Sequence, residues 1–591
     1  MDNRSMRLSA CRCVCLLTIA FLASCGDDAS VTPTDGGDAG DADAIPWDGS
    51  NPEPALPAIT PCRSGWQEIE LGRLSVRSCV PYEPGVGMAS DVAMPRSFIV
   101  APTECPFGSF RFTGEPACTP IGEACPVGEW PATAADYYVR AGSTGAGTQA
   151  DPLGTVAEAI AAASAGDTIA VGQGRYEEKL TIDRALTILG TCVERVAIML
   201  PSGETGPTVL VAVPGVVFRD LAVHGFLQLP GHDAIAVEGG TLELEGVLTD
   251  LVRVTGSGRL TAETVVFHFD SSVATTVATP RYALGLSGAS QAEVTRAGFW
   301  YGDADRVFAQ TMFNTLLVSE GSSLVLRDAF LNGVGHAVRA GLVVSGGSRA
   351  ELEGVYMPNA KTSVPTRVTG EGSELVIRES FIAPYIVEDI ESAPLAVLEG
   401  ARATVERSTF THGRQALIVN QGSHLEVRDS VLFSTSGLSR DIGGYGILNR
   451  AFRLPQTVEL ERVLIEATRD IGLVAFGPTT LTGTDISVLD TRARGCTVVP
   501  CVDFPAGIGL GVYSEGRASL QRFRIAGSLL VGAQIARDGL LELDQGFVED
   551  NVIGVNVQVD NYDLNTLTSR VIYRNNRDGN FAARNLPVPG L

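Results

Sequence analysis

The chain has 591 residues, more than a single compact core usually accommodates, so several domains or an elongated repeat architecture is expected. Hydrophobic residues make up 45% of the sequence, which is enough to build a core. The formal net charge of -24 argues against binding to nucleic acid, because contact with a phosphate backbone needs clustered Lys and Arg.

The N-terminal segment has the pattern of an export signal. Three arginines precede an apolar run from Val14 to Ala23, which is too short for a stable membrane-spanning helix. The run ends in Leu-Ala-Ser-Cys-Gly at 22–26, which resembles the lipobox of bacterial lipoproteins. The resemblance implies that residues 1–24 are a signal peptide and that Cys25 is acylated. An ordinary signal peptide with an incidental cysteine is the alternative.

An acylated cysteine would anchor the mature chain, since several acyl chains hold to a bilayer far better than one. The implied partner is therefore a membrane, with the outer membrane or cell surface expected rather than the inner membrane. Residues 25–60 combine this cysteine with a linker rich in Asp, Gly, Ala and Pro and free of Lys and Arg. Such a segment buries too little apolar surface to fold, so we expect a disordered tether.

Eight cysteines follow Cys25, and an exported protein meets an oxidising compartment. Disulfides are therefore expected, with zinc ligation as the weaker alternative because no Cys-x-x-Cys pair occurs. Residues 61–131 form a small cysteine-containing region whose local spacing suggests short loops, each closed by its own bridge. Six cysteines allow fifteen connectivities. From the spacing we predict the pairs Cys62–Cys79, Cys105–Cys118 and Cys125–Cys192, and a loop stapled by Cys496 and Cys501.

A short helix is predicted ahead of many strands. Thr155 and Glu158 have capping-box spacing, an Ala-rich run follows, and Gly166 lies where a left-handed C-terminal cap is expected. Gly-Asp-Thr-Ile at 166–169 and Gly-Arg-Tyr at 174–176 come next. This segment resembles the opening of pectate-lyase-like right-handed β-helix proteins. The resemblance implies that the helix caps the open end of a stack of coils.

Repeats continue almost to the C-terminus. Each has a Gly turn, an alternating strand, an acidic residue at the strand's end and a second short apolar strand. The best examples begin at Gly321, Gly347, Gly372 and Gly422, and the period is about 22 to 28 residues, the range for one coil of a solenoid. The Leu/Asn pattern of leucine-rich repeats is missing, and antiparallel hairpin turns are scarce. We therefore predict an all-β fold, a right-handed parallel β-helix over residues 132–591.

Fold does not determine function, so an enzyme must be argued from a site. Lyases of this superfamily combine acidic Ca²⁺ ligands with an Arg or Lys, and its hydrolases combine paired aspartates with a His-Gly motif. The chain has His224-Gly225 and His412-Gly413 but no matching Asp-Asp, and turn histidines explain these motifs better. No cofactor or metal is expected, and Ca²⁺ is implied only if the protein is a lyase.

Two groups of residues are candidate sites. Arg440-Asp441 recurs as Arg469-Asp470 one coil later, so the two pairs could stack and form a catalytic, uronate or cation site. A surface ion-pair ladder is the alternative.

The second group is a candidate ligand site at Trp300, Tyr301, Asp303 and Asp305. Aromatic rings beside carboxylates suit sugar stacking and Ca²⁺, whereas a solvated turn with a buried Trp is the alternative.

The leading hypothesis is a monomeric, membrane-tethered β-helix that binds or organises polysaccharide, or contacts another cell, without catalysis. A divergent polysaccharide lyase or glycoside hydrolase is the second hypothesis. A purely structural surface protein, which would bind no ligand, is the third.

Overall fold

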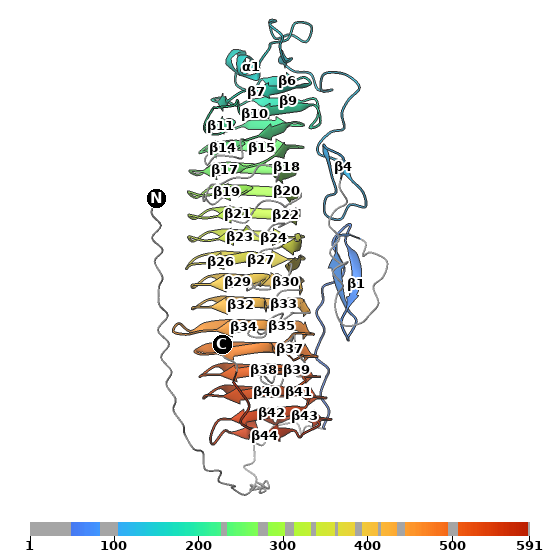
Figure 1. The fold of residues 1–591 in the computed structure, drawn as a ribbon, viewed down its shortest axis with the longest axis vertical. Coiled ribbons are helices and arrows are strands. Elements are labelled where there is room, and N and C mark those ends of the chain that lie inside the picture. Colours follow the sequence, from blue (N-terminus) through green and yellow to red (C-terminus); the bar gives the residue numbers. More distant parts are fainter. Residues whose placement is uncertain are drawn as a thin grey trace, which may run out of the picture. The chain divides into compact units, whose positions relative to one another are not determined.

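The computed structural model describes residues 49–82, 105–225, 233–269, 282–301, 313–331, 338–360, 365–384, 393–411, 415–433, 444–493 and 506–588. They belong to one unit, Gly49–Leu591. This unit is a column of coils in which each strand pairs in parallel with strands of the neighbouring coils (Figure 1). The predicted parallel β-helix with a short N-terminal helix is confirmed.

The first strand of each coil belongs to a 16-stranded parallel sheet, called sheet A below. Its strands are β8 (Leu180–Ile182), β11 (Val209–Val211), β14 (Ile235–Glu238), β17 (Val252–Thr255), β19 (Leu284–Leu286), β21 (Phe313–Val318), β23 (Val338–Val344), β26 (Thr366–Thr369), β29 (Leu395–Leu398), β32 (Gln415–Asn420), β34 (Tyr445–Arg450), β36 (Ile471–Phe476), β38 (Ile508–Tyr513), β40 (Val531–Ala536), β42 (Ile553–Gln558) and β44 (Phe581–Ala582).

The rest of each coil is one bent strand, or two short ones, in a 24-stranded parallel sheet, called sheet B. Its strands are β5 (Tyr137–Val139), β6 (Thr168–Val171), β7 (Gly174–Glu177), β9 (Thr187–Gly190), β10 (Val196–Met199), β12 (Val216–Arg219), β13 (Ala222–His224), β15 (Thr241–Glu245), β16 (Leu248–Thr249), β18 (Arg259–Phe269), β20 (Gln291–Tyr301), β22 (Ser323–Leu331), β24 (Arg349–Glu353), β25 (Tyr356–Ala360), β27 (Glu374–Arg378), β28 (Phe381–Pro384), β30 (Arg402–Glu406), β31 (Thr409–Thr411), β33 (His424–Phe433), β35 (Gln456–Glu466), β37 (Thr479–Leu489), β39 (Arg517–Ala526), β41 (Leu540–Glu549) and β43 (Ser569–Arg574).

Strand alternation builds the core inside the coils. In β22, Leu324 and Leu326 are buried in the column, whereas Arg327 lies on the outer surface. Because the coils stack in register, identical positions meet, and the rings of Phe267 and Phe299 stack at 4.5 Å.

The Gly-Ser repeats have a structural role at the turns into sheet B. The backbone N–H of Ser290 donates to the hydroxyl of Ser322, and that of Ser322 to the hydroxyl of Ser348, each at 3.2 Å. The buried hydroxyls thus satisfy turn donors of the preceding coil.

Helix α1 (Val156–Ala162) has the predicted capping box at Thr155 and Glu158. Its apolar face, which includes Val156 and Ile160, is buried on the core, as a cap requires. The predicted C-terminal cap at Gly166 is wrong. The helix ends earlier, because Ala163 is already extended as the chain turns toward β6. No helix in the described part of the chain is long and apolar enough to cross a membrane.

All three predicted disulfides among residues 62–192 are confirmed. Cys62–Cys79 closes the loop around the antiparallel hairpin of β1 (Gln67–Leu71) and β2 (Val76–Val80), and Cys105–Cys118 the loop around β3 (Ser109–Phe110) and β4 (Thr119–Pro120). Cys125–Cys192 joins this N-terminal segment to the column. Cys25, Cys496 and Cys501 lie outside the described residues.

Residues 49–82 and 105–131, called the strap, lie along the outer surface of sheet B (Figure 1). Trp66, Phe110 and Phe112 of the strap form one buried cluster with outward-facing side chains of the coils. The coil residues of this cluster include Leu248, Val266, Phe330, Tyr356, Phe381 and Leu464. The strap therefore covers an apolar row that the coils alone would expose.

The predicted boundary at residue 60 does not coincide with a structural boundary, since residues 49–60 also lie on the column. Asn51 donates to the carbonyls of Gly546 and Arg570 in the last coils. Ala55 N–H donates to Asp485 and Ala58 N–H to Asp429, both at 3.0 Å. One turn of a proline-rich extended chain rises about 9 Å in three residues, close to the spacing of two coils. The hydrogen bonds from Asn51, Ala55 and Ala58 hold this segment on the column, although its composition predicts disorder.

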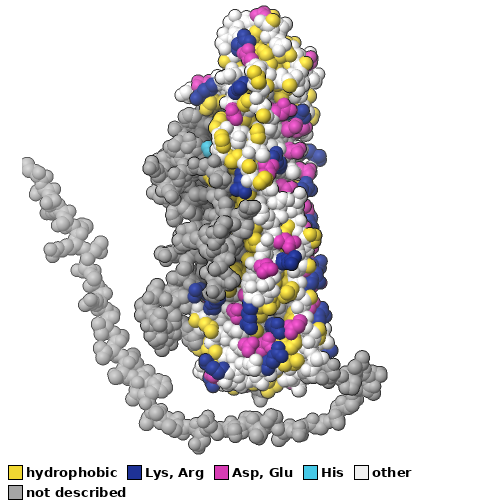
Figure 2. Space-filling model, turned by 90° about the vertical axis from the view of Figure 1, so that its right-hand side faces the viewer, with side chains coloured by type: hydrophobic (Ala, Val, Ile, Leu, Met, Phe, Trp, Pro, Cys, Tyr) yellow, Lys and Arg dark blue, Asp and Glu magenta, His cyan; other side chains and the backbone are white. Residues whose placement is uncertain are grey.

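The strap is held by residues at the bends of sheet B. Asp328, Glu379, Arg407 and Asp429 occupy bends and have left-handed backbones, with φ of 45° to 51°. Three of these four bend residues are the acidic residues that the repeats predict at strand ends. Across the face in Figure 2, basic and acidic side chains are interspersed down the column.

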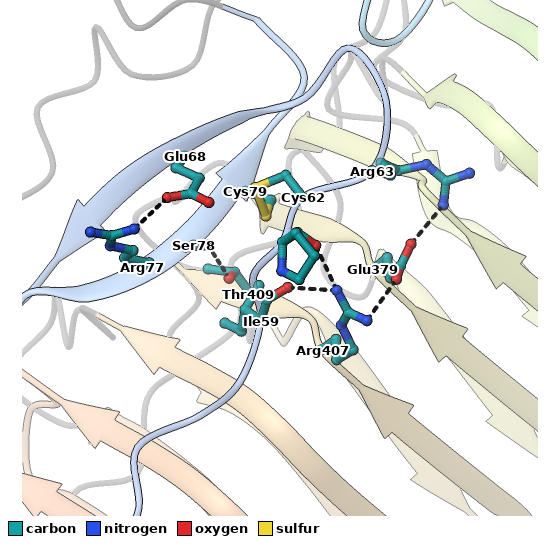
Figure 3. Close-up of a disulfide and its surroundings, with 11 residues drawn as sticks. Ile59, Cys62, Arg63, Glu68, Arg77, Ser78, Cys79, Glu379, Arg407 and Thr409 are labelled. Atoms are coloured by element: carbon teal, nitrogen blue, oxygen red, sulfur yellow. Dashed lines mark hydrogen bonds and ion pairs between the residues drawn. A yellow bond between two sulfur atoms is a disulfide. The ribbon is translucent and has the colours of Figure 1, made fainter.

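Arg63 and Arg407 link strap and bends (Figure 3). Arg63 is 2.9 Å from Asp328 and 3.3 Å from Glu379, and its side chain is only 14% exposed. Gly354 at the intervening bend permits this approach, since a Cβ there would lie 2.4 Å from the guanidinium carbon of Arg63. Arg407 donates to the carbonyls of Ile59 and Pro61 at 2.9 and 2.7 Å.

The pKa values of two bend carboxylates under the strap shift in opposite directions. Burial raises the pKa of Asp220 to about 6, although the N–H of Glu123 bonds its carboxylate and opposes the rise. Burial also acts on Asp429, but hydrogen bonds from Arg462 and Ala58 outweigh it and hold the pKa of Asp429 below its ordinary value. Burial thus dominates at Asp220, whereas the hydrogen bonds dominate at Asp429.

Asp220→Asn is expected to raise the free energy of unfolding at pH 8 by about 1 kcal/mol, allowing for solvent screening. Between about pH 4 and 6 the folded chain keeps a proton that the unfolded chain releases, so this group lowers stability as pH rises through that window.

Asp429→Asn is expected to lower stability at pH 8 by about 1–2 kcal/mol, an effect that fades at acid pH. Urea unfolding at pH 4 and 8 measures both, and effects of the same sign at pH 8 would contradict the assignment.

Candidate functional site

One turn between sheets A and B is longer than its neighbours. Residues 451–455 join β34 to β35, whereas 421–423 and 477–478 make the same connection in the adjacent coils. Insertions in a solenoid commonly form its binding face.

The long turn presents two apolar side chains to solvent. Phe452 is 56% exposed and Leu454 is 57% exposed. The turn is anchored from inside the column, where buried Gln456 donates to Asn449 at 2.6 Å and to the carbonyl of Val419 at 3.0 Å. The turn that exposes Phe452 and Leu454 is therefore held in place by buried hydrogen bonds at its end.

Short turns of the three preceding coils complete a hollow. Glu371, Glu399 and Gln421 line it together with Phe452, Arg453 and Leu454, and we call these six residues the shelf. The hollow has a volume of about 740 Å³. Gly400 and Gly422 leave room beside the shelf, and a Cβ on Gly422 would lie 3.1 Å from the Cβ of Leu454.

Several contacts orient the shelf side chains. The guanidinium carbon of Arg450 lies 4.8 Å from the ring centroid of Phe452, and Phe476 approaches that ring edge-on at 6.4 Å. The hydroxyl of Thr369 donates to Glu399 at 2.8 Å. An aromatic ring, carboxylate and amide acceptors and a guanidinium donor thus surround one hollow.

This set of groups suits binding better than catalysis. The ring offers an apolar contact surface, carboxylates accept hydrogen bonds, and the guanidinium donates them. Glu371 and Glu399 come from successive turns of one wall and are exposed to solvent, whereas a glycosidase places two carboxyls on either side of the bond it cleaves. Nowhere in the described ranges do three or more His, Cys, Asp or Glu side chains gather as a metal site would require.

The His-Gly motif at His224 forms a local pair. His224 Nδ1 lies 3.0 Å from Asp250, whose second oxygen accepts the N–H of Gly225 at 3.1 Å. Burial disfavours the charged imidazole, but the attraction and hydrogen bond from Asp250 outweigh it, so the pKa of His224 is raised. These bonds join the end of β13 to the next coil of the column. His412-Gly413 lies outside the described residues.

The predicted Trp300 site falls partly within the described residues. Trp300 packs into the apolar cluster under the strap, with its ring 6.1 Å from that of Phe330. Tyr301 ends β20, while Asp303 and Asp305 lie outside the described residues. Trp300 therefore has a packing role.

Of the two Arg-Asp pairs predicted to stack, the structure describes only Arg469 and Asp470. Burial, with Arg492 nearby, holds the pKa of Arg469 below its ordinary value. Asp470 is 2% exposed, and its carbonyl accepts the N–H groups of Gly507 and Ile508. Arg440 and Asp441 lie outside the described residues, so the stacking of the two pairs stays a prediction.

Sequence reasoning missed the shelf. A usable signal was present, since Arg-Ala-Phe-Arg-Leu-Pro at 450–455 stands where most repeats have a short Gly turn. Two large apolar residues beside arginine in such a turn indicate exposed side chains rather than core residues. The carboxylates on the neighbouring turns gave no such signal, because only stacking brings them together.

No protein-family model matches the chain, and no curated protein matches it. Among solved structures it is similar to pectin methylesterase PemA from Erwinia chrysanthemi, at 15% identity over 52% of this chain and 82% of that one, with a TM-score of 0.23. It is similar to the catalytic domain of a GH87 alpha-1,3-glucanase in complex with nigerose, at 12% identity over 79% of this chain and 71% of that one, with a TM-score of 0.30. A PL6 family alginate lyase matches at 8% identity over 73% of this chain and 97% of that one, with a TM-score of 0.18. These proteins are carbohydrate-active enzymes, and the likeness concerns the fold alone.

Proposed function

We propose that the protein is an exported, lipid-anchored β-helix that binds polysaccharide at the shelf without catalysis. The observation that carries the proposal is the long turn at 451–455, which holds Phe452 in solvent beside hydrogen-bonding groups of both kinds. The flat apolar face of a sugar ring stacks on such a side chain, while its hydroxyls bond to carboxylates and guanidinium. The volume of the hollow lies in the range of small-ligand sites.

The strap supports a non-catalytic role. It packs on the outward row of sheet B from Leu248 to Leu464 and buries it. Over the described part of that sheet, the row is therefore closed to a polymer. The shelf lies elsewhere, at the turns between sheets A and B, and is open to solvent.

The proposal is tested by retention on immobilised polysaccharides. Phe452→Ala is expected to weaken retention about tenfold, which corresponds to about 1.4 kcal/mol of lost ring contact. The matched control is Phe107→Ala, since Phe107 is another phenylalanine with 66% exposure, on the strap.

Equal retention of the two variants would contradict the assignment of the site. Release of new reducing ends or unsaturated uronates by the unchanged protein would favour the lyase or hydrolase hypothesis instead. Failure of the unchanged protein to bind any polysaccharide would favour the structural hypothesis.

A further inference from the structure

We propose that the shelf selects uncharged polysaccharides and excludes uronate polymers. This inference rests on the proposed function and names its ligand class. It starts from the distribution of charge among the six shelf residues.

Two carboxylates lie along one wall of the shelf. Glu371 and Glu399 occupy successive turns of the column, next to Gly372 and Gly400. Strands of successive coils are about 4.8 Å apart, so a ligand that touches one carboxylate is close to the other. An ionised carboxylate only accepts hydrogen bonds. The wall therefore suits sugar hydroxyls and repels a sugar carboxylate.

The position of Glu399 is set before a ligand arrives. Its backbone has a left-handed φ of 57°, and its side chain accepts the hydroxyl of Thr369 at 2.8 Å. Little side-chain ordering is then needed on binding. A rotamer change that moved the Glu399 carboxylate away from an acidic sugar would break the bond to Thr369.

Arg453 does not offset the acidic wall. It is the single cationic side chain of the shelf, against two carboxylates. The other cation nearby, Arg450, lies over the ring of Phe452. The whole chain carries a net charge of -24, so the long-range field also opposes a polyanion.

The column contains a natural control for these charges. Glu320 precedes Gly321 as Glu399 precedes Gly400, with nearly the same φ of 56°, but it does not line the shelf. Glu320→Gln therefore removes one exposed carboxylate in the same local conformation. Gln421, which precedes Gly422 at φ 56°, shows that glutamine fits this kind of turn.

The experiment compares gel retardation of the full chain by uncharged polysaccharides (a glucan, a mannan and a galactan) and by polygalacturonate and alginate at low salt. The unchanged protein is expected to be retarded by at least one uncharged polymer and at least tenfold less by the uronates. The double variant Glu371→Gln/Glu399→Gln is expected to bind the uncharged polymer less and the uronates more, so that the ratio falls about tenfold. Glu320→Gln is expected to keep the original ratio.

The inference is overturned if uronates retard the unchanged protein as strongly as the uncharged polymers, or if the double variant keeps the original ratio. An equal change with Glu320→Gln would also overturn it, since general charge would then explain the selectivity. Failure of every polymer to retard the unchanged protein is a different result, because it removes the proposed function itself. Melting temperatures of the variants check that all remain folded.

Discussion

A chain that begins at residue 132 is expected to aggregate and to melt about 10 °C or more below the complete protein. Without the strap, the outward row of sheet B loses its cover. Phe330, Tyr356, Phe381 and Leu464 are at most 4% exposed in the complete structure. Burial of each such side chain contributes about 1.5–3 kcal/mol, and a contiguous exposed apolar row favours association. The sum corresponds to a shift of this size for a large domain.

The comparison needs two controls. The shortened chain should carry Cys192→Ser, because its partner Cys125 is removed with the strap. A chain that begins at residue 49 keeps the strap and is expected to match the complete protein. Light scattering and thermal unfolding measure the outcome, and equal melting temperatures for the two shortened chains would show that the strap is dispensable.

Replacement of the cysteine of the predicted lipobox, Cys25→Ser, is expected to move the protein completely from the membrane fraction to the released fraction. Each buried methylene of an acyl chain contributes about 0.8 kcal/mol, so loss of all the chains removes the anchor rather than weakening it. The expectation belongs to the proposed lipid anchor and follows from the sequence at 22–26.

Cell fractionation with immunoblotting measures the distribution. Cys11→Ser is the matched control, since it removes a cysteine from the predicted signal peptide without changing the predicted lipobox. The anchor proposal fails if the Cys25 variant stays in the membrane fraction, or if the control is released equally. Either result would leave the proposed binding site at the shelf untouched, because that site depends on the column alone.

Local patterns predicted much of the fold. Alternating apolar residues in the Gly-Ser repeats predicted the coils, and spacing alone predicted the pairs Cys62–Cys79 and Cys105–Cys118. The capping box at Thr155 was correct, because its two bonds lie within one helical turn. The position of Gly166 was misleading, since the end of that helix depends on where β6 joins the sheet.

The candidate site could not be predicted in the same way. Phe452 belongs to an insertion that the sequence displays, but Glu371 and Glu399 reach it only because coils of unequal length stack in register. The strap was equally hidden, since Ala55 and Ala58 bond to carboxylates about 430 and 371 residues away.

Which side chains face into the coils could be predicted strand by strand, because a period of two is a property of each strand taken alone. The contacts on the outside of the column could not be predicted in this way. There, the cover over sheet B, the bonds to the bends and the grouping of the shelf all depend on which coils are neighbours. Such contacts join residues far apart in the chain and leave no local pattern in either partner.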